Sequence, residues 1–275
     1  MDDLDRERGA PPPPRGILRG GRRDGAILGD WILPCDALAP VVHHFWVVHW
    51  DLRTPFRAET LPHPGARLTV EIRSGVPRGA IAGVRTRRTS QRLAATGRIF
   101  GIAFRPAAFQ PLLGAPMSTL TDRVVPIGAV LGPEGEAMAR RIREARGFAQ
   151  AIAIAEAFLV RHVRPLEPEA TRVRDLVERL RSDRSLLRVE NVAEAFGVDV
   201  RSLQRLFRKY VGVSPKCVIR RYRLHEAAER LKGPRPPALA QLATSLGYAD
   251  QAHFAREFKQ VTGRTPRSFR LLWQP

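Results

Sequence analysis

The chain has 275 residues, of which 46 are Lys or Arg and 27 are Asp or Glu, so its formal net charge is +19. This length excludes a miniprotein held together by disulfides and favours two domains, each with a core of its own. The positive charge favours a polyanionic partner. Only four of the cations are Lys, however, and an Arg-rich composition also arises from coding bias, so charge alone does not identify a nucleic-acid-binding protein.

The two cysteines, Cys35 and Cys217, lie far apart and have no C-x-x-C partner. This excludes a disulfide framework and a cysteine-based zinc site, and it fits a reducing compartment. The first residues, MDDLDRER, are acidic where a signal peptide would be basic and then apolar, and no run approaches the roughly 18 apolar residues of a membrane span. We therefore predict a soluble, cytoplasmic protein with no membrane partner.

The first part of the chain is predicted to be a tail followed by a β-rich domain. Residues 1–28 contain four consecutive prolines and the segment RGGRRDG, with almost nothing apolar to bury, so we expect a flexible tail. Residues 29–165 form the predicted amino-terminal domain. Short apolar segments with period-two alternation, separated by Gly and Pro, indicate strands. Helices are expected at residues 106–113, 134–146 and 148–162.

After the proline-containing segment RHVRPLEPEAT, the pattern is helical only, so we predict a second domain over residues 166–275. Its first helix is expected over residues 169–182, where Val173, Leu176, Val177 and Leu180 form one apolar face. The fold class predicted for the whole chain is α+β: a mixed β-rich amino-terminal domain followed by an all-α domain.

Within the second domain the sequence repeats itself, because residues 190–215 align with residues 240–266. At an offset of 50, Ala193 and Gly197 match Ala243 and Gly247. At an offset of 51, six further residues match, namely Asp199, Leu203, Arg205, Phe207, Gly212 and Pro215 with Asp250, Phe254, Arg256, Phe258, Gly263 and Pro266. Each unit has a short helix, a turn at Gly and a basic amphipathic helix, which is the pattern of a helix-turn-helix.

The turn residues have the properties that this motif needs. Gly197 and Gly247 permit the positive φ of a tight turn, and Asp199 and Asp250 are placed to accept hydrogen bonds from the free amides of the following helix. Between the units, Ser214 and Pro215 open a helix that is expected to end near Leu231 and to span about 25 Å. This helix would place two recognition helices on one DNA face, about 34 Å apart, where they read successive major-groove segments.

The segments SLQRLFRKYVGVSPKCVIRRYRLHEAAERL and LATSLGYADQAHFAREFKQVTGRTPRSFR resemble the AraC/XylS family of bacterial transcriptional regulators. The resemblance covers about residues 168–272, and two motifs at the family spacing are far less expected by chance than one. It implies an all-helical output domain that binds double-stranded promoter DNA.

The resemblance implies a role for each exposed position of the two recognition helices. The residues that we expect to face bases are Arg201, Gln204 and Arg205 in the first helix and Gln251, Ala252, Ala255 and Arg256 in the second. Arg pairs with guanine and Gln with adenine, whereas Ala contacts only the thymine methyl group. Expected to contact phosphates are Arg208, Lys209, Lys259, Arg267 and Arg270. The alternative for each cation is a solvated surface position. The apolar residues Leu203, Leu206, Phe207, Phe254 and Phe258 are predicted to be core.

The amino-terminal domain resembles an uncharacterised domain found ahead of AraC-type output domains, mainly through residues 101–132 and the segment LPHPGARLTVEI. That resemblance implies no particular ligand. The sequence leaves two roles open for this domain: a sensor of a small-molecule effector, or a module that only makes a homodimer.

No catalytic, cofactor or metal site is predicted. The candidates His43, His44, His49 and His63 have no positioned carboxylate or thiolate, so a structural role is favoured, with His43 and His49 on one side of a strand. Motifs of hydrolases, metalloproteases and nucleotide-binding proteins are absent from the sequence. The cluster Arg85, Arg87, Arg88 and Arg92 is interpreted as a solvated loop rather than an anion site.

Two other classes of DNA-binding protein are alternatives to a regulator. A DNA-alkylation repair protein with an AraC-type domain needs a four-cysteine zinc site, which Cys35 alone cannot form. A non-specific DNA-binding or DNA-packaging protein stays open as the alternative function, although it would not need a doubled recognition unit.

Overall fold

A computed structural model describes residues 25–61, 63–73 and 76–273. Most of the predicted tail, residues 1–24, lies outside these ranges. Residues 25–28 belong instead to the first strand, β1 (Gly25–Ile32), which pairs in antiparallel fashion with β2 (Val42–Thr60). The prediction that the tail extends to residue 28 is therefore wrong for its last four residues, because their backbone hydrogen-bonding groups are paired in the sheet.

The amino-terminal domain is built on a six-stranded sheet with the order β1-β2-β5-β3-β4-β6, in which the paired strands are antiparallel. The remaining strands are β3 (Arg67–Arg73), β4 (Val76–Ala82), β5 (Thr89–Phe104) and β6 (Val124–Pro126). Buried and more exposed residues alternate along much of β2, whereas four consecutive residues of β5, 99–102, are all buried, as expected where a strand is covered on both faces.

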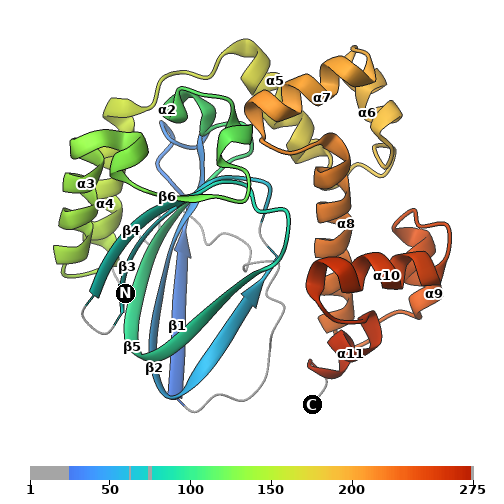
Figure 1. The fold of residues 1–275 in the computed structure, drawn as a ribbon, viewed down its shortest axis with the longest axis horizontal. Coiled ribbons are helices and arrows are strands. Elements are labelled where there is room, and N and C mark those ends of the chain that lie inside the picture. Colours follow the sequence, from blue (N-terminus) through green and yellow to red (C-terminus); the bar gives the residue numbers. More distant parts are fainter. Residues whose placement is uncertain (1–24, 62, 74–75, 274–275) are drawn as a thin grey trace.

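Helices α3 (Gly128–Glu144) and α4 (Phe148–His162) cover one face of the sheet (Figure 1). Helix α4 has the predicted bounds. Helix α3 starts six residues before the predicted start, because two helical segments join across a kink at Gly132, where φ is 63°. The predicted helix at residues 106–113 is reduced to α2 (Gln110–Leu113), and a 3₁₀ helix, η1 (Met117–Leu120), follows it.

The other face of the sheet carries a smaller apolar cluster around two tryptophans. A Cβ atom on Gly97 would overlap the ring of Trp50, and one on Gly101 would overlap the ring of Trp46. The two glycines therefore let the indole rings lie directly against the neighbouring strand. Trp50 is almost fully buried and packs with other residues of this cluster.

Helices alone make up the described part of the second half of the chain. They are α5 (Pro168–Arg179), α6 (Val189–Phe196), α7 (Val200–Tyr210), α8 (Pro215–Lys232), α9 (Leu239–Ser245), α10 (Gln251–Thr262) and α11 (Pro266–Leu271). In Figure 1, α8 stands beside the sheet, with α6 and α7 at one end and α9 to α11 at the other. The predicted α+β fold class is confirmed.

Two separate apolar cores lie along α8, and each includes residues of the amino-terminal domain. The core around α5 to α7 includes Val84 and Ala107, and the core around α9 to α11 includes Leu61. The amino-terminal domain therefore packs against both helix-turn-helix units. None of the helices within the described ranges is long and apolar enough to cross a membrane.

Candidate nucleic-acid interface

The first helix-turn-helix unit consists of α6 and α7. Gly197 ends α6 with φ at 73°, the left-handed conformation that favours glycine. Asp199 caps α7, and its carboxylate accepts hydrogen bonds from the amide of Ser202 at 2.9 Å and from its hydroxyl at 2.7 Å. These bonds to the charged form lower the pKa of Asp199 below its ordinary value. The turn and the cap together fix the direction in which α7 leaves the turn.

The second unit, α9 and α10, repeats this local structure. Gly247 also has φ at 73°, and Asp250 caps α10 by accepting a hydrogen bond from the amide of His253 at 2.6 Å. This bond lowers the pKa of the Asp250 carboxyl. The buried Tyr248 adds a contact of its own, because its hydroxyl donates to Glu257 Oε1 at 2.5 Å and so ties the turn to the middle of α10.

One face of each recognition helix is buried. Leu203 and Phe207 on α7 and Phe254 and Phe258 on α10 have no exposed surface, and Leu206 has 8%. The prediction that these five residues are core is confirmed. Because each helix buries one apolar face, its opposite face is fixed toward the outside.

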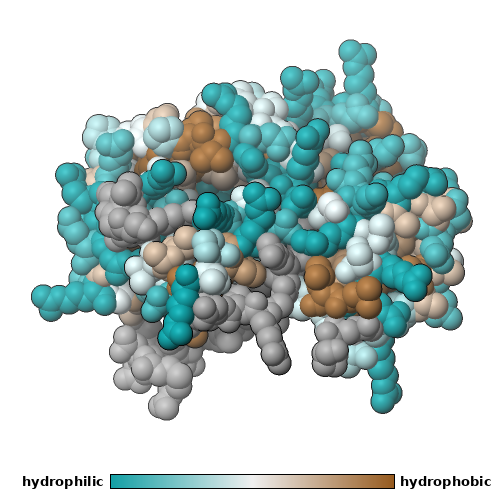
Figure 2. Space-filling view, turned by 60° about the horizontal axis from the view of Figure 1, so that its bottom comes forward, coloured by the Kyte–Doolittle hydropathy of each residue, from teal (hydrophilic) through white to brown (hydrophobic). Residues whose placement is uncertain are grey.

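The predicted base-reading residues lie on the outward faces. Ala255 is half-buried, and the other six are exposed, namely Arg201, Gln204, Arg205, Gln251, Ala252 and Arg256. In Figure 2, the face of the helical domain that comes forward is mainly hydrophilic, with an apolar patch among the polar side chains. An exposed row of Arg and Gln on a rigid helix is the arrangement that base recognition in a major groove needs.

The predicted phosphate-contacting residues fall into two groups. Arg208, Lys259 and Arg267 are exposed and Arg270 is half-buried, and within the described ranges the structure shows no carboxylate paired with any of them. Lys209 differs, because its ammonium group donates to Tyr210 Oη at 2.7 Å and lies 3.7 Å from Glu167 and 3.8 Å from Glu169. These two carboxylates compensate the charge of Lys209 within the protein.

An ion-pair cluster between the two halves of the chain was not predicted from sequence. Glu59, at the end of β2, is only 5% exposed and accepts hydrogen bonds from Arg88 and, at 2.7 Å, from Arg264 next to the end of α10. Burial alone would raise the pKa of Glu59, but the hydrogen bond from Arg264 and the charges of both arginines lower it overall. The partners are 29 and 205 residues away in sequence, so no local pattern indicates them.

Four of the histidines, His43, His44, His63 and His225, form a chain of neighbouring rings. His43 and His44 share a contact of 2.7 Å between their Nδ1 atoms, and His63 stacks on His225 of α8 with ring centroids 4.4 Å apart. Burial lowers the pKa of His44 to about 3 and that of His63 well below its ordinary value, so both rings are neutral at pH 7. In the ranges that the structure describes, no group of three or more ligand residues is placed to hold a metal ion.

The expectation that His43 and His49 share one side of a strand is wrong. The pairing of β2 with β5 shifts between Val42 and His44, so a bulge interrupts the alternation at His43. The ring of His43 turns toward His44 and His63, whereas His49 is exposed near α4.

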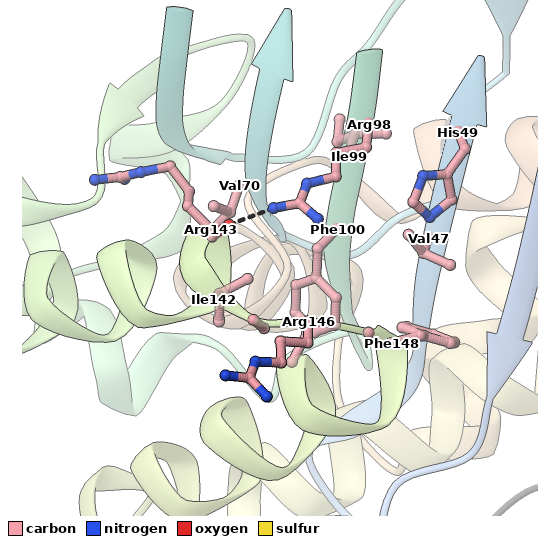
Figure 3. A pocket seen from close by; sticks show the side chains of 13 residues that line it. Val47, His49, Val70, Arg98, Ile99, Phe100, Ile142, Arg143, Arg146 and Phe148 are labelled. Carbon is pink, nitrogen blue, oxygen red and sulfur yellow. Dashed lines mark hydrogen bonds between the residues drawn. The ribbon is translucent and has the colours of Figure 1, made fainter. Parts of the chain in front are cut away.

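A small pocket lies between the sheet and the end of α3 (Figure 3). Its walls include Val47, Phe100, Ile142 and Phe148, and the guanidinium group of Arg98 donates to the backbone carbonyl at the end of α3. The pocket measures about 80 Å³. A cavity that holds benzene measures about 150 Å³, so this one accommodates little more than water unless its walls move.

Two helix-turn-helix units joined by one helix define a DNA-binding domain. A family model described as a helix-turn-helix domain matches residues 192–271, and one described as a domain of unknown function (DUF6597) matches residues 31–126. The probable transcription factor PqrA of Proteus vulgaris is 31% identical over 84 residues, which cover 30% of this chain and 68% of PqrA. The chain belongs to the AraC/XylS family of DNA-binding transcriptional regulators.

Other relatives match over a smaller part of their length. The transcriptional activator RhaS of Pectobacterium carotovorum is 29% identical over 80 residues, which cover 29% of this chain and 28% of RhaS. Among solved structures, an AraC-type regulator of Chromobacterium violaceum is 24% identical, with a TM-score of 0.34 over 38% of this chain and 94% of that one. ToxT of Vibrio cholerae is 11% identical, with a TM-score of 0.42 over 84% of this chain and 98% of ToxT.

Proposed function

We propose that the protein is a sequence-specific transcriptional regulator that reads two successive major-groove segments of promoter DNA. The observation that carries this proposal is the pair of capped recognition helices, α7 and α10, near opposite ends of α8, each with its apolar face buried and its polar face exposed. The 18 residues of α8 span about 27 Å, which suits two helices placed about one turn of DNA apart.

Base recognition is assigned to Arg201, Gln204 and Arg205 in the first segment. Gln251, Ala252, Ala255 and Arg256 are assigned to the second. Arg binds guanine and Gln binds adenine through two hydrogen bonds each, whereas Ala discriminates only by contact with a thymine methyl group. The first segment is therefore expected to be the more sharply defined.

Phosphate contacts are assigned to Arg208, Lys259, Arg267 and Arg270. Lys209, which the sequence placed in this set, becomes the weakest member because Glu167 and Glu169 lie beside its ammonium group. Each contact that neutralises a phosphate releases counterions, so binding is expected to weaken steeply as salt rises.

The division into two domains, the cytoplasmic location and the absence of catalysis are part of the same proposal. The first domain is proposed to run from β1, at Gly25, to residue 165, and the second to cover residues 166–275. For the amino-terminal domain, we propose a role in regulation, as an effector-binding or homodimerising module. Its packing against both helix-turn-helix units supports this role, because a change in this domain then reaches both recognition helices.

Competition between DNA sequences tests the proposed function against non-specific packaging. Duplexes selected from a random pool on the full chain are labelled, and unlabelled selected or scrambled duplexes compete for binding at physiological salt. We expect the selected duplexes to compete at least 10³-fold better than scrambled ones, as specific regulators do. Equal competition by both would favour the packaging alternative and contradict the proposal.

A further inference from the structure

A second pocket, of about 230 Å³, lies where the first residues of β3 and β5 meet the loop between β4 and β5. Three arginines, Arg67, Arg85 and Arg88, line it together with the hydroxyl-bearing residues Thr89 and Ser90, and no carboxylate is among the described lining residues. We call it the anion pocket. It includes two members of the arginine cluster that the sequence suggested was a solvated loop.

The positive charge of this region exceeds what its carboxylates neutralise. The two nearby carboxylates are already engaged: Glu59 by Arg88 and Arg264, and Asp122 by the amide of Thr86 at 2.8 Å and its hydroxyl at 2.5 Å. Arg85 donates to a neutral group, the carbonyl oxygen of Asp122, at 2.7 Å. With the buried Arg221 of α8, five guanidinium groups therefore surround two carboxylates.

The repulsion between these cations acts across the boundary between the two halves of the chain. Burial and the charge of Arg221 lower the pKa of Arg67 to about 10. Arg221 also donates to the backbone carbonyl of Arg85 at 2.7 Å, so α8 touches the loop that lines the pocket. An anion in the pocket would reduce the repulsion and strengthen this contact.

The pocket is also linked to the second recognition helix. Arg88 lies against Gly263, the cap of α10, since a Cβ atom on this glycine would be 2.7 Å from Arg88 Nε. Arg88 and Arg264 both donate hydrogen bonds to Glu59. The side chain of Arg88 therefore connects the pocket to the Glu59 ion pairs and to the end of α10.

We propose that the anion pocket binds a small molecule carrying a phosphate monoester group, and that this ligand strengthens the contact of the amino-terminal domain with α8 and α10. A phosphate monoester offers two negative charges and three terminal oxygens, which suit several guanidinium groups and the Ser90 hydroxyl. Binding itself is independent of the proposed function, whereas any effect on DNA affinity rests on it.

Calorimetric titration of the full chain with inorganic phosphate, at ionic strength held constant with chloride, tests the binding step. We expect one site, and a loss of about tenfold or more in affinity for Arg67→Gln, the cost of a charge-assisted hydrogen bond. Arg87→Gln is the matched control, because Arg87 is exposed in the same loop and does not line the pocket. No binding at millimolar phosphate, or the same loss in both variants, would overturn the proposal.

Ser90→Asp is a second variant that tests the anion pocket if Arg67→Gln fails to fold. Ser90 is exposed, so an added carboxylate is expected to abolish phosphate binding without lowering the melting temperature measured in the absence of phosphate. Unchanged phosphate affinity in a folded Ser90→Asp protein would contradict the assignment of the pocket.

Amide hydrogen exchange tests the coupling without DNA. Phosphate is expected to slow exchange at residues 83–88 and 259–266 in the natural sequence and in Arg87→Gln, but not in Ser90→Asp. Binding without slower exchange would overturn the coupling. Displacement of phosphate by duplex DNA would show that the pocket contacts the DNA backbone, and it would overturn the assignment to a small ligand.

Discussion

The two helix-turn-helix units share one local structure and expose different side chains. Each has a glycine at φ 73° and an aspartate that caps its recognition helix. Where α7 exposes Arg201 and Gln204, however, α10 has Ala252 and Ala255. The repeat therefore keeps the residues that shape the motif, and of the outward-facing positions it keeps the Arg205 and Arg256 pair, whereas Arg201 and Gln204 are replaced by Ala252 and Ala255.

The two units also differ in how the amino-terminal domain holds them. At the first, η1 packs beside the end of α7, and the Thr121 hydroxyl donates to the Gly212 carbonyl at 2.5 Å. At the second, the main polar contact is the ion pair of Glu59 with Arg264. Neutral contacts depend little on pH and salt, whereas an ion pair depends on both. One ion pair also joins the amino-terminal domain to the first core, between Arg105 and Glu178 of α5 at 3.3 Å, but both side chains are about 30% exposed, whereas Glu59 is buried and binds two arginines. The contact of η1 with α7 is therefore expected to respond less to pH than the Glu59 cluster at the second unit.

The largest expected effect comes from breaking one core at a time. Phe207→Ala in the first core and Phe258→Ala in the second should each lower the free energy of unfolding by about 3–5 kcal/mol, because both rings are fully buried. Amide exchange should accelerate mainly around α6 and α7 in the first variant and around α9 to α11 in the second. Equal acceleration in both units would show that the two cores form one cooperative body.

Removal of the charge of Glu59 should affect the second unit alone. Glu59→Gln is expected to cost about 1–3 kcal/mol at pH 7, the value of hydrogen bonds to a charged group. Because the folded-state pKa of Glu59 is lowered, its contribution is present at neutral pH and is lost as pH falls below about 4. Unfolding measured against pH should therefore show a smaller acid loss in the variant.

Glu194→Gln is the matched control for this experiment, because Glu194 is an exposed carboxylate on α6, whereas Glu59 is buried between the two halves of the chain. A control that loses as much stability as Glu59→Gln, or faster exchange around α7 in Glu59→Gln, would contradict the division between the two attachments.

The base-reading difference predicts unequal consequences of mutation. Arg205→Ala should cost about 1–3 kcal/mol on the selected duplex and relax base preference only in the first segment. Enlarging Ala255 to Gln should change preference only in the second. Arg140→Ala, an exposed position on α3, serves as the control. A loss for Arg205→Ala that is the same on every duplex would move this residue to the phosphate contacts.

The smallest expected effect separates two neighbours on α7. Arg208→Ala should lower the slope of log affinity against log salt by about 0.9, the value for one phosphate contact, and weaken all duplexes alike. Lys209→Ala should change the slope less, because Glu167 and Glu169 already compensate its charge. Binding titrations at several salt concentrations measure both, and a larger change for Lys209 would reverse the assignment.

Sequence patterns predicted the helical domain in detail because its determinants are local. Gly197, Asp199 and the periodic apolar residues act within a few positions of one another, so the turn, the cap and the buried face follow from short segments. The bounds of α8 were predicted to within one residue for the same reason, since Ser214 and Pro215 mark its start and its end was expected near Leu231.

No local sequence pattern indicates the contacts between the two halves of the chain. Glu59 and Arg264 are 205 residues apart, and the partners of Lys209 lie in α5 and the segment before it. Their pairing depends on how the sheet docks on α8, which no short segment encodes. The bulge at His43 was missed because it arises from the pairing of β2 with β5 rather than from the residues of β2 alone.

The proposed protein reads two major-groove segments with α7 and α10 of one chain. Methylation interference on a duplex selected with the full chain tests this proposal most directly, because methylation of guanine N7 blocks contacts in the major groove. We expect methylation to interfere with binding in two segments on one face of the duplex, about 10 base pairs apart, with stronger interference in the segment that Arg205→Ala weakens. A single segment, or two on opposite faces, would contradict it.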